Sequence, residues 1–204
     1  MSNLPESTTE DKIMEAAKTV FVKYGLYGAR MQDIADTAGI NKALLHYYFR
    51  SKEKLFDKVF EGALVKYFQQ MDVFSDSSLP VIQRIFKYVE NIIDFYEEYP
   101  QMSMFIIKEI SINPEMFKQK VSLAKKTNGV RFIGLLEEGM ANGEIKQIDT
   151  TMFFINLQSL CSYPFLASPL FKHALKANHK DWSDFDSNKL KERVKLFVEN
   201  NLSL

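Results

Sequence analysis

The chain is short of cysteine, histidine and net charge, and each shortage excludes a class of protein. Cys161 is the only cysteine among 204 residues, so no intrachain disulfide can form and a reducing, cytoplasmic setting is expected. The three histidines have no metal-ligand spacing with the carboxylates, and no HExxH, glycine-rich phosphate loop or GxSxG sequence occurs. The sequence therefore predicts no enzyme, no metal site and no cofactor.

Signals for secretion or membrane insertion are also lacking. The N-terminus carries Glu6, Glu10 and Asp11 and has no apolar signal core. The run from Thr150 to Phe171 contains no charged residue, but polar residues and two prolines interrupt it, which makes it too polar for a lipid-facing helix. We expect no membrane partner and interpret this run as a buried or partner-facing helix.

Charge is balanced over the whole chain but not locally. With 26 basic and 26 acidic residues, the protein is not a generally polybasic nucleic-acid binder. Between Ile40 and Lys54, however, four basic residues face only Glu53, a net charge of +3; they are Lys42, Arg50, Lys52 and Lys54. Such a cluster is either a solvated helix face or a patch that contacts phosphate, and the motif around it favours phosphate.

Apolar residues recur at intervals of three and four along the chain, which predicts an all-α protein. No alternating strand pattern or internal repeat is present. The polar segment Phe74–Pro80 is the first clear break. We therefore expect a three-helix DNA-binding domain over residues 1–55, a linking helix over residues 52–72, and a second helical domain over residues 56–204. A capping box at Ser7 and Glu10 would begin the first helix.

Residues 31–49 have the spacing of a helix-turn-helix motif. Ala35 is small enough to let a second helix pack close, Gly39 can take a positive φ in the turn, and Leu45 seats the second helix in the core. The second helix is expected to begin after Asn41, a favourable N-cap residue. The residues predicted to face inward beside these are Ile34, Ala38, Ile40 and Tyr48.

The opposite side of the second helix is the predicted reading surface. Ala43, His46, Tyr47 and Arg50 point outward, with Lys42 at the flank, and such a face suits the major groove better than solvent. Leu44 lies at the edge, where it would meet either a thymine methyl group or neighbouring side chains. Arg30 precedes the first helix and would either reach a phosphate or remain simply exposed. His46 would hydrogen-bond a base edge or a phosphate.

The stretch GARMQDIADTAGINKALLHYYFRSKEKLF resembles the DNA-binding region of TetR-family transcriptional regulators. The resemblance covers about residues 7–60, and it implies that Lys52 touches the DNA backbone. Arg30, Leu44 and His46 depart from the residues usual in the family, so the recognised DNA sequence stays open. The resemblance also implies a C-terminal ligand-binding domain and a dimer formed by the last two long helices.

The second domain is expected to serve dimerisation and ligand binding. The uncharged helix Thr150–Leu166, with Asn188–Leu202, is apolar on more than one side, which either a homodimer or complete burial in a monomer would explain. Methionine and aromatic residues are frequent between residues 86 and 132, and most of them are core. The ligand pocket implied by the family resemblance is assigned from these residues to Phe86, Tyr96, Phe105 and Phe132.

The sequence thus predicts a homodimeric regulator that binds a palindromic operator on double-stranded DNA. We expect a repressor that an unknown small apolar effector releases from DNA. The alternative is an architectural DNA-binding protein that has no effector.

Overall fold

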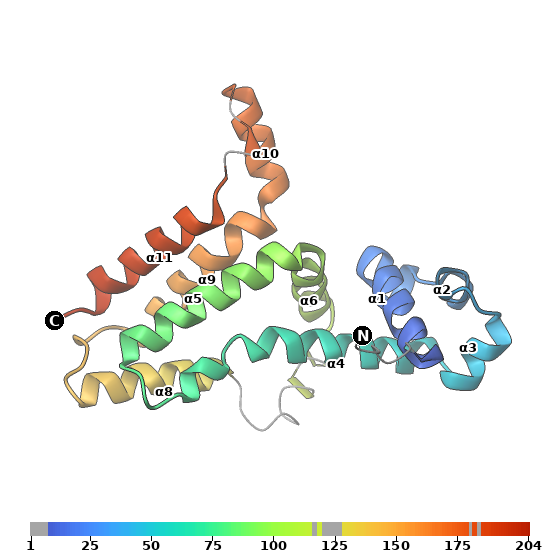
Figure 1. Ribbon diagram of the computed structural model, residues 1–204, viewed down its shortest axis with the longest axis horizontal. Coiled ribbons are helices and arrows are strands. Elements are labelled where there is room, and N and C mark those ends of the chain that lie inside the picture. The colour runs from blue at the N-terminus through green and yellow to red at the C-terminus, as the bar shows by residue number, and fades with distance from the viewer. Residues whose placement is uncertain (1–7, 116–117, 120–127, 180, 183–184) are drawn as a thin grey trace, which may run out of the picture. The chain divides into compact units, whose positions relative to one another are not determined.

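The described residues of the chain form an all-α protein, as predicted. In the computed structural model, residues 8–115, 118–119, 128–179, 181–182 and 185–204 are described, and none of these lies in a β-strand. They divide into two compact units, within Met1–Val65 with Phe105–Pro114, and within Lys66–Met104 with Glu115–Leu204. The divisions fall inside α4 (Lys52–Gln69) and α6 (Pro100–Ile112; Figure 1), so each of these helices contributes to both units.

The first unit begins with α1 (Thr9–Gly28). Thr8 caps it through a capping box with Asp11, one residue later than predicted, and Ser7 lies outside the described residues. The apolar stripe of α1 is buried: Ile13, Ala16, Ala17, Val20 and Phe21. Gly25 has a φ of 68°, which breaks the regular helix near its end.

Two short helices and most of α4 follow α1 in this unit, which also contains the end of α6. They are α2 (Met31–Ala38), α3 (Lys42–Tyr48) and α4 (Lys52–Gln69). The start of α3 after Asn41 agrees with the sequence prediction. The predicted linking helix to residue 72 is shorter, since α4 ends at Gln69 and the 3-10 helix η1 (Asp72–Ser75) follows.

An aromatic cluster fills the interior of the first unit. Phe56 packs edge-on against Phe21 at 5.1 Å between ring centroids, and Phe105 of α6 (Pro100–Ile112) lies 5.7 Å from both Phe56 and Phe60. All four rings are buried. The C-terminal part of α6 therefore belongs to the core beneath α1 and α4.

One carboxylate is buried beside this core. Glu109 of α6 is almost inaccessible to solvent, and its Oε1 would lie 3.3 Å from a Cβ added at Gly25. Burial raises the pKa of the Glu109 carboxyl above its ordinary value, and the neighbouring Lys108 ammonium opposes this by a smaller amount. The carboxyl of Glu109 is therefore easier to protonate in the folded chain than in the unfolded chain.

Replacing Glu109 by glutamine is therefore expected to raise the melting temperature at pH 7. The buried negative charge destabilises the folded state once the pH exceeds the raised pKa, and this cost disappears below the ordinary glutamate value of 4.5. The advantage of Glu109→Gln should consequently shrink as the pH falls towards 4.5. Thermal unfolding across this range measures it, with the exposed Glu137→Gln as a control that should change little. Equal melting temperatures for Glu109→Gln and the wild type at pH 7 would contradict the assignment.

The second unit is built around α5 (Val81–Glu98), which contacts α8 (Asn128–Ala141), α9 (Thr150–Leu166) and α11 (Ser187–Leu202). Along α5, one face is buried almost throughout, including Ile85, Tyr88, Ile92 and Tyr96. Pro100 lies shortly after the end of α5 and is the first residue of α6. Residues 116–117 and 120–127, between α6 and α8 in the sequence, lie outside the described part.

The uncharged helix has the bounds predicted for it. Asp149 caps α9 by accepting a hydrogen bond from the backbone N–H of Met152 at 2.9 Å. Phe153, Leu157 and Cys161 are its buried residues. Within the part of the chain that the structure describes, no helix is both long and apolar enough to span a membrane.

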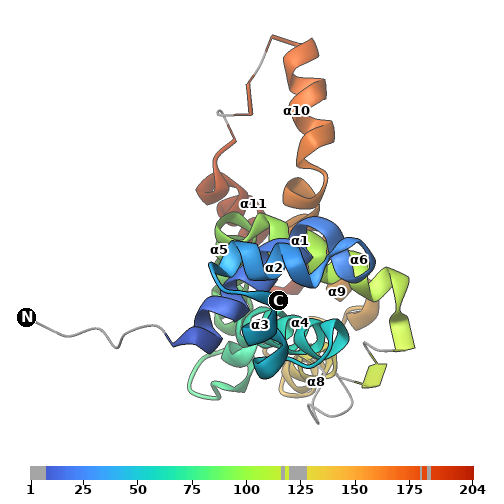
Figure 2. The same ribbon diagram turned by 90° about the vertical axis from the view of Figure 1, so that its right-hand side faces the viewer.

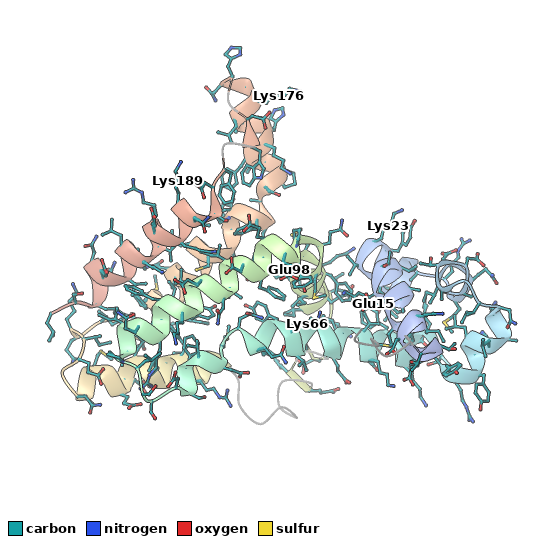
Figure 3. All side chains as sticks on the ribbon, in the orientation of Figure 1. Glu15, Lys23, Lys66, Glu98, Lys176 and Lys189 are labelled. Carbon is teal, nitrogen blue, oxygen red and sulfur yellow. The ribbon has the colours of Figure 1, made fainter. Side chains whose placement is uncertain are left out.

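The helix α10 (Ser168–Ala177) follows directly on α9 and projects outward from its end in two perpendicular views (Figures 1 and 2). None of its residues is buried. Figure 3 places Lys176 near its outer end. Its aromatic Phe171 stacks on Trp182, which in turn stacks on Phe185, so ring contacts connect α10 to the segment that precedes α11.

Candidate DNA-binding site

The turn between α2 and α3 has the geometry that the sequence spacing predicts. Gly39 adopts a left-handed conformation with φ 68° and ψ 32°, and the N–H of Ile40 donates to the carbonyl of Ala35 at 3.0 Å. The side chain of Asn41 then caps α3 by accepting from the N–H of Leu44 at 2.8 Å. Hydrogen bonds thus close the end of α2 and the start of α3 within the ten residues from Ala35 to Leu44.

Burial fixes which side of α3 faces the core. Ile34, Ala35 and Leu45 are completely buried, as predicted. Ala38 and Ile40 are only half-buried, and Tyr48 is exposed, so its predicted inward position is wrong. The helix ends at Tyr48 and Phe49 has an extended backbone, with φ −131° and ψ 100°. The side chain of Phe49 is the one buried there instead.

The predicted reading residues are all exposed on α3 or beside it. This holds for Lys42, Ala43, Leu44, His46, Tyr47 and Arg50. Tyr47 is 80% exposed and touches the Tyr48 ring edge-on at 5.5 Å. A large aromatic side chain left so open contributes little to the core, which leaves it available for a partner.

Two basic residues flank this face in different ways. Arg30 is exposed at the N-cap of α2 and makes no side-chain capping bond. Lys52 is half-buried, and its Nζ donates to the backbone carbonyl of Ala29 at 3.0 Å. Lys52 thus ties the start of α4 to the connection between α1 and α2. An ammonium has three donors, so this bond leaves two for a phosphate.

Lys42 is exposed at the first position of α3, whereas Lys52 also makes a hydrogen bond within the fold, so substitutions of the two lysines can be compared. Lys42→Ala and Lys52→Ala are both expected to weaken binding to all DNA sequences and to reduce the salt slope by about 1 each. Only Lys52→Ala should also lower the melting temperature, because it removes the bond to Ala29. Fluorescence anisotropy over a salt series, with thermal unfolding of each variant, measures both effects. A salt slope unchanged in both variants would exclude these lysines from the DNA interface.

Sequence reasoning did not single out the exposed aromatic residues at the end of α1. Tyr27 is 80% exposed and Tyr24, which the periodic pattern placed in the apolar stripe, is 46% exposed. The positive φ of Gly25 interrupts the helix, so the three- and four-residue spacing no longer predicts burial for the residues that follow, Tyr27 among them. Gly25 and Gly28 were the residues in the sequence that could have indicated a break in the helix at this point.

The four residues predicted to line a ligand pocket are divided between the two compact units. Phe105 belongs to the aromatic core of the first unit. In the second unit, Phe86 is half-buried with the Lys195 ammonium 5.6 Å from its ring centroid. Tyr96 and Phe132 are buried in the core of that unit. In the described part of the chain, no group of three or more histidine, cysteine or acidic side chains is placed to hold a metal ion.

The short α2, the glycine turn and the exposed face of α3 define a helix-turn-helix DNA-binding protein. Comparison with known proteins agrees. The family model described as "Bacterial regulatory proteins, tetR family" matches residues 13–59. The HTH-type transcriptional repressor NicS of Pseudomonas putida is 29% identical over 194 residues, which cover 88% of this chain and 89% of NicS.

Two further proteins extend the comparison. The HTH-type transcriptional regulator RutR of Escherichia coli K12 is 31% identical over 104 residues, 51% of this chain and 49% of RutR. The solved structure of the ketosteroid transcriptional regulator KstR2 of Mycobacterium tuberculosis superposes with a TM-score of 0.71 at 16% identity, covering 100% of this chain and 97% of KstR2. The chain belongs to the TetR family of transcriptional regulators, and it is a DNA-binding regulator.

Proposed function

We propose that the protein is a homodimeric repressor that binds a palindromic operator and leaves it when a small effector binds. The observation that carries this proposal is the open face of α3, where Tyr47 and its exposed neighbours have no role in the core of the first unit. The residues proposed to contact DNA are Arg30, Lys42, Ala43, Leu44, His46, Tyr47, Arg50 and Lys52.

A dimer is supported by the outer face of α9. Its inner face is buried through Phe153, Leu157 and Cys161, yet large apolar side chains also remain exposed on the same helix: Met152, Ile155, Leu160 and Tyr163. Leu196 adds an exposed apolar side chain on α11. Exposed apolar residues grouped on one helix are typical of an interface. A two-fold axis at α9 and α11 would supply the second copy of α3 that a palindrome requires.

The two regions of the chain are proposed to have the roles that the sequence predicts. Residues 1–55 are proposed to read DNA, and residues 56–204 to bind the effector and the second subunit, with α4 continuous between them. Of the four residues first considered for the effector site, Tyr96 and Phe132 are retained, because both lie in the core of the second unit. Phe86 is left out of the proposed site because the Lys195 ammonium lies over its ring, and Phe105 is left out because it belongs to the first unit.

Footprinting on the promoter nearest the gene tests this function. In the absence of effector and at modest salt, we expect two protected half-sites related by a dyad, with centres about 34 Å apart. The absence of any protected palindrome would refute the proposal. Tyr47→Ala should reduce the preference for this site over random DNA while leaving the dimer intact. Unchanged preference in that variant would remove Tyr47 from the reading face.

A further inference from the structure

The projecting helix α10 is held to its own subunit along one side only. An isolated helix of ten residues is marginal in water, so α10 needs contacts along its sides. Phe171 of α10 stacks on Trp182 at 6.2 Å between ring centroids, and Trp182 stacks on Phe185 at 4.6 Å. Phe185 in turn meets Phe165 of α9 edge-on at 5.7 Å. This row of rings fixes one side of α10 to the end of α9.

A second side of α10 is apolar and open to solvent. Leu170 is 60% exposed, and Ala174 and Ala177 are exposed four and seven residues further along the helix. Residues at this spacing lie on one face of a helix, so the three side chains form a single strip. With its ring contacts on one side and this strip on another, α10 lacks a partner along the strip.

The strip continues the outer face of α9. Tyr163, which is 53% exposed, belongs to the apolar residues of α9 that are proposed to meet a second subunit. Its ring also meets that of Phe171 edge-on at 5.6 Å, and only Ala167 separates the end of α9 from the start of α10. A second subunit that covers the outer face of α9 therefore lies beside the base of α10.

The third side of α10 is basic. Lys172 and Lys176 are exposed on it, and the helix contains no acidic residue. The Lys172 ammonium lies 5.8 Å from the centroid of the Trp182 ring. Among the residues that the structure describes, neither lysine forms an ion pair. A helix with this side exposed suits an acidic surface on its partner.

The outer face of α11 carries such a surface. Leu196 is 44% exposed, and Glu192 and Glu199 are exposed on the same face, four residues before it and three after it. Neither carboxylate forms an ion pair within the described residues. Arg193 is exposed at the opposite edge of Leu196. The face thus has an apolar centre and one acidic edge, which complements the apolar strip and basic side of α10.

We propose that α10 is a dimerisation arm that lies along α11 of the second subunit. Leu170 packs beside Leu196 of that subunit, and the two lysines of α10 face its acidic edge. This proposal rests on the proposed function as a homodimer formed by α9 and α11. It adds to that dimer two arm contacts, one on each side of the two-fold axis, because each subunit offers both an arm and an α11 face.

Replacing Leu170 by glutamate tests the arm. Sedimentation of the full-length protein over a concentration series measures the dissociation constant of the dimer, and Leu170→Glu is expected to raise it at least about tenfold, because two unpaired charges enter the interface. The matched control is Val65→Glu on α4, since Val65 is 56% exposed. This control should keep the wild-type dissociation constant. An unchanged constant in Leu170→Glu overturns the proposal.

Exchange of charges tests the surface that the arm contacts. The double variant Lys172→Glu with Lys176→Glu is expected to weaken the dimer about tenfold at low salt and less at high salt, because like charges then face each other. Adding Glu192→Lys and Glu199→Lys should restore most of the lost affinity. Damage confined to α10 could not be repaired by substitutions on another helix, so an absence of rescue overturns the assignment to α11.

A control with the same change in net charge accompanies this exchange. Lys12→Glu with Lys87→Glu reverses two exposed lysines on α1 and α5. This double variant should dimerise as the wild type does. Equal weakening by both double variants would make the effect one of net charge and overturn the proposed contact.

The arm and the dimer fail in different ways. If the wild-type protein sediments as a monomer at every concentration, the homodimer of the proposed function fails and the arm fails with it. If Ile155→Glu on α9 separates the dimer while Leu170→Glu and the lysine double variant dimerise as the wild type does, the dimer stands and the arm is wrong. Weakening by Leu170→Glu together with rescue of the lysine variant supports both.

Discussion

Replacing Ile155 by glutamate is expected to separate the dimer and to lower operator affinity by about 10²- to 10⁴-fold, the range by which two linked sites exceed one. Ile155 is 49% exposed on α9, one turn from the exposed Met152. A charge placed there would be buried without a partner in the proposed interface. Because the Ile155 side chain is solvent-exposed in a single subunit, the Ile155→Glu variant should still fold.

Sedimentation analysis and anisotropy on operator DNA measure this change. The matched control is Val65→Glu, which introduces the same charge at a similarly exposed apolar residue on α4. Val65→Glu should remain dimeric and keep its affinity. A dimeric Ile155→Glu protein with wild-type affinity would show that α9 does not form the interface.

The neighbouring leucines of α3 provide the second large effect. Leu45 is completely buried and Leu44 is 37% exposed. Leu45→Ala is expected to lower the free energy of unfolding by about 2–5 kcal/mol, because it leaves a cavity under α3. Leu44→Ala should change stability by less than about 0.5 kcal/mol and instead alter the preference among operator sequences.

Urea unfolding of both variants separates packing from reading. A large loss of stability in Leu44→Ala would place this side chain in the core and remove it from the reading face. A stable Leu45→Ala protein would contradict the packing of α3 described above. The pair differs by one position in the chain, so composition and helix propensity are the same for both.

The helix-turn-helix motif could be predicted because its determinants are local. Ala35, Gly39 and Leu45 act through residue size and backbone freedom at fixed spacing, and the cap at Asn41 involves a residue only three positions away. The misplaced Tyr48 marks the limit of this reasoning. Helical periodicity holds only while the helix continues, and the extended backbone of Phe49 ends it one residue later.

The interior of the second unit could not be predicted in the same way. Gln158 hydrogen-bonds with Tyr88 and Tyr67, which lie 70 and 91 positions away in the chain. No local sequence pattern identifies Gln158 as the common partner of these two tyrosines. Phe105 illustrates a second limit of sequence reasoning, because it was assigned to the ligand pocket of the second domain but belongs to the first unit. It lies in a stretch rich in methionine and aromatic residues, but α6 continues across the division between the units and places it against Phe56 and Phe60.

Selection of DNA from a random-sequence library by the purified full-length protein tests the central claim most directly. Two copies of α3 related by a two-fold axis should enrich an inverted repeat whose half-sites are about one helical turn apart. Ile155→Glu should lose this enrichment and Val65→Glu should retain it. Enrichment of a single unrepeated site, or of no sequence at all, would contradict a dimeric operator-binding regulator.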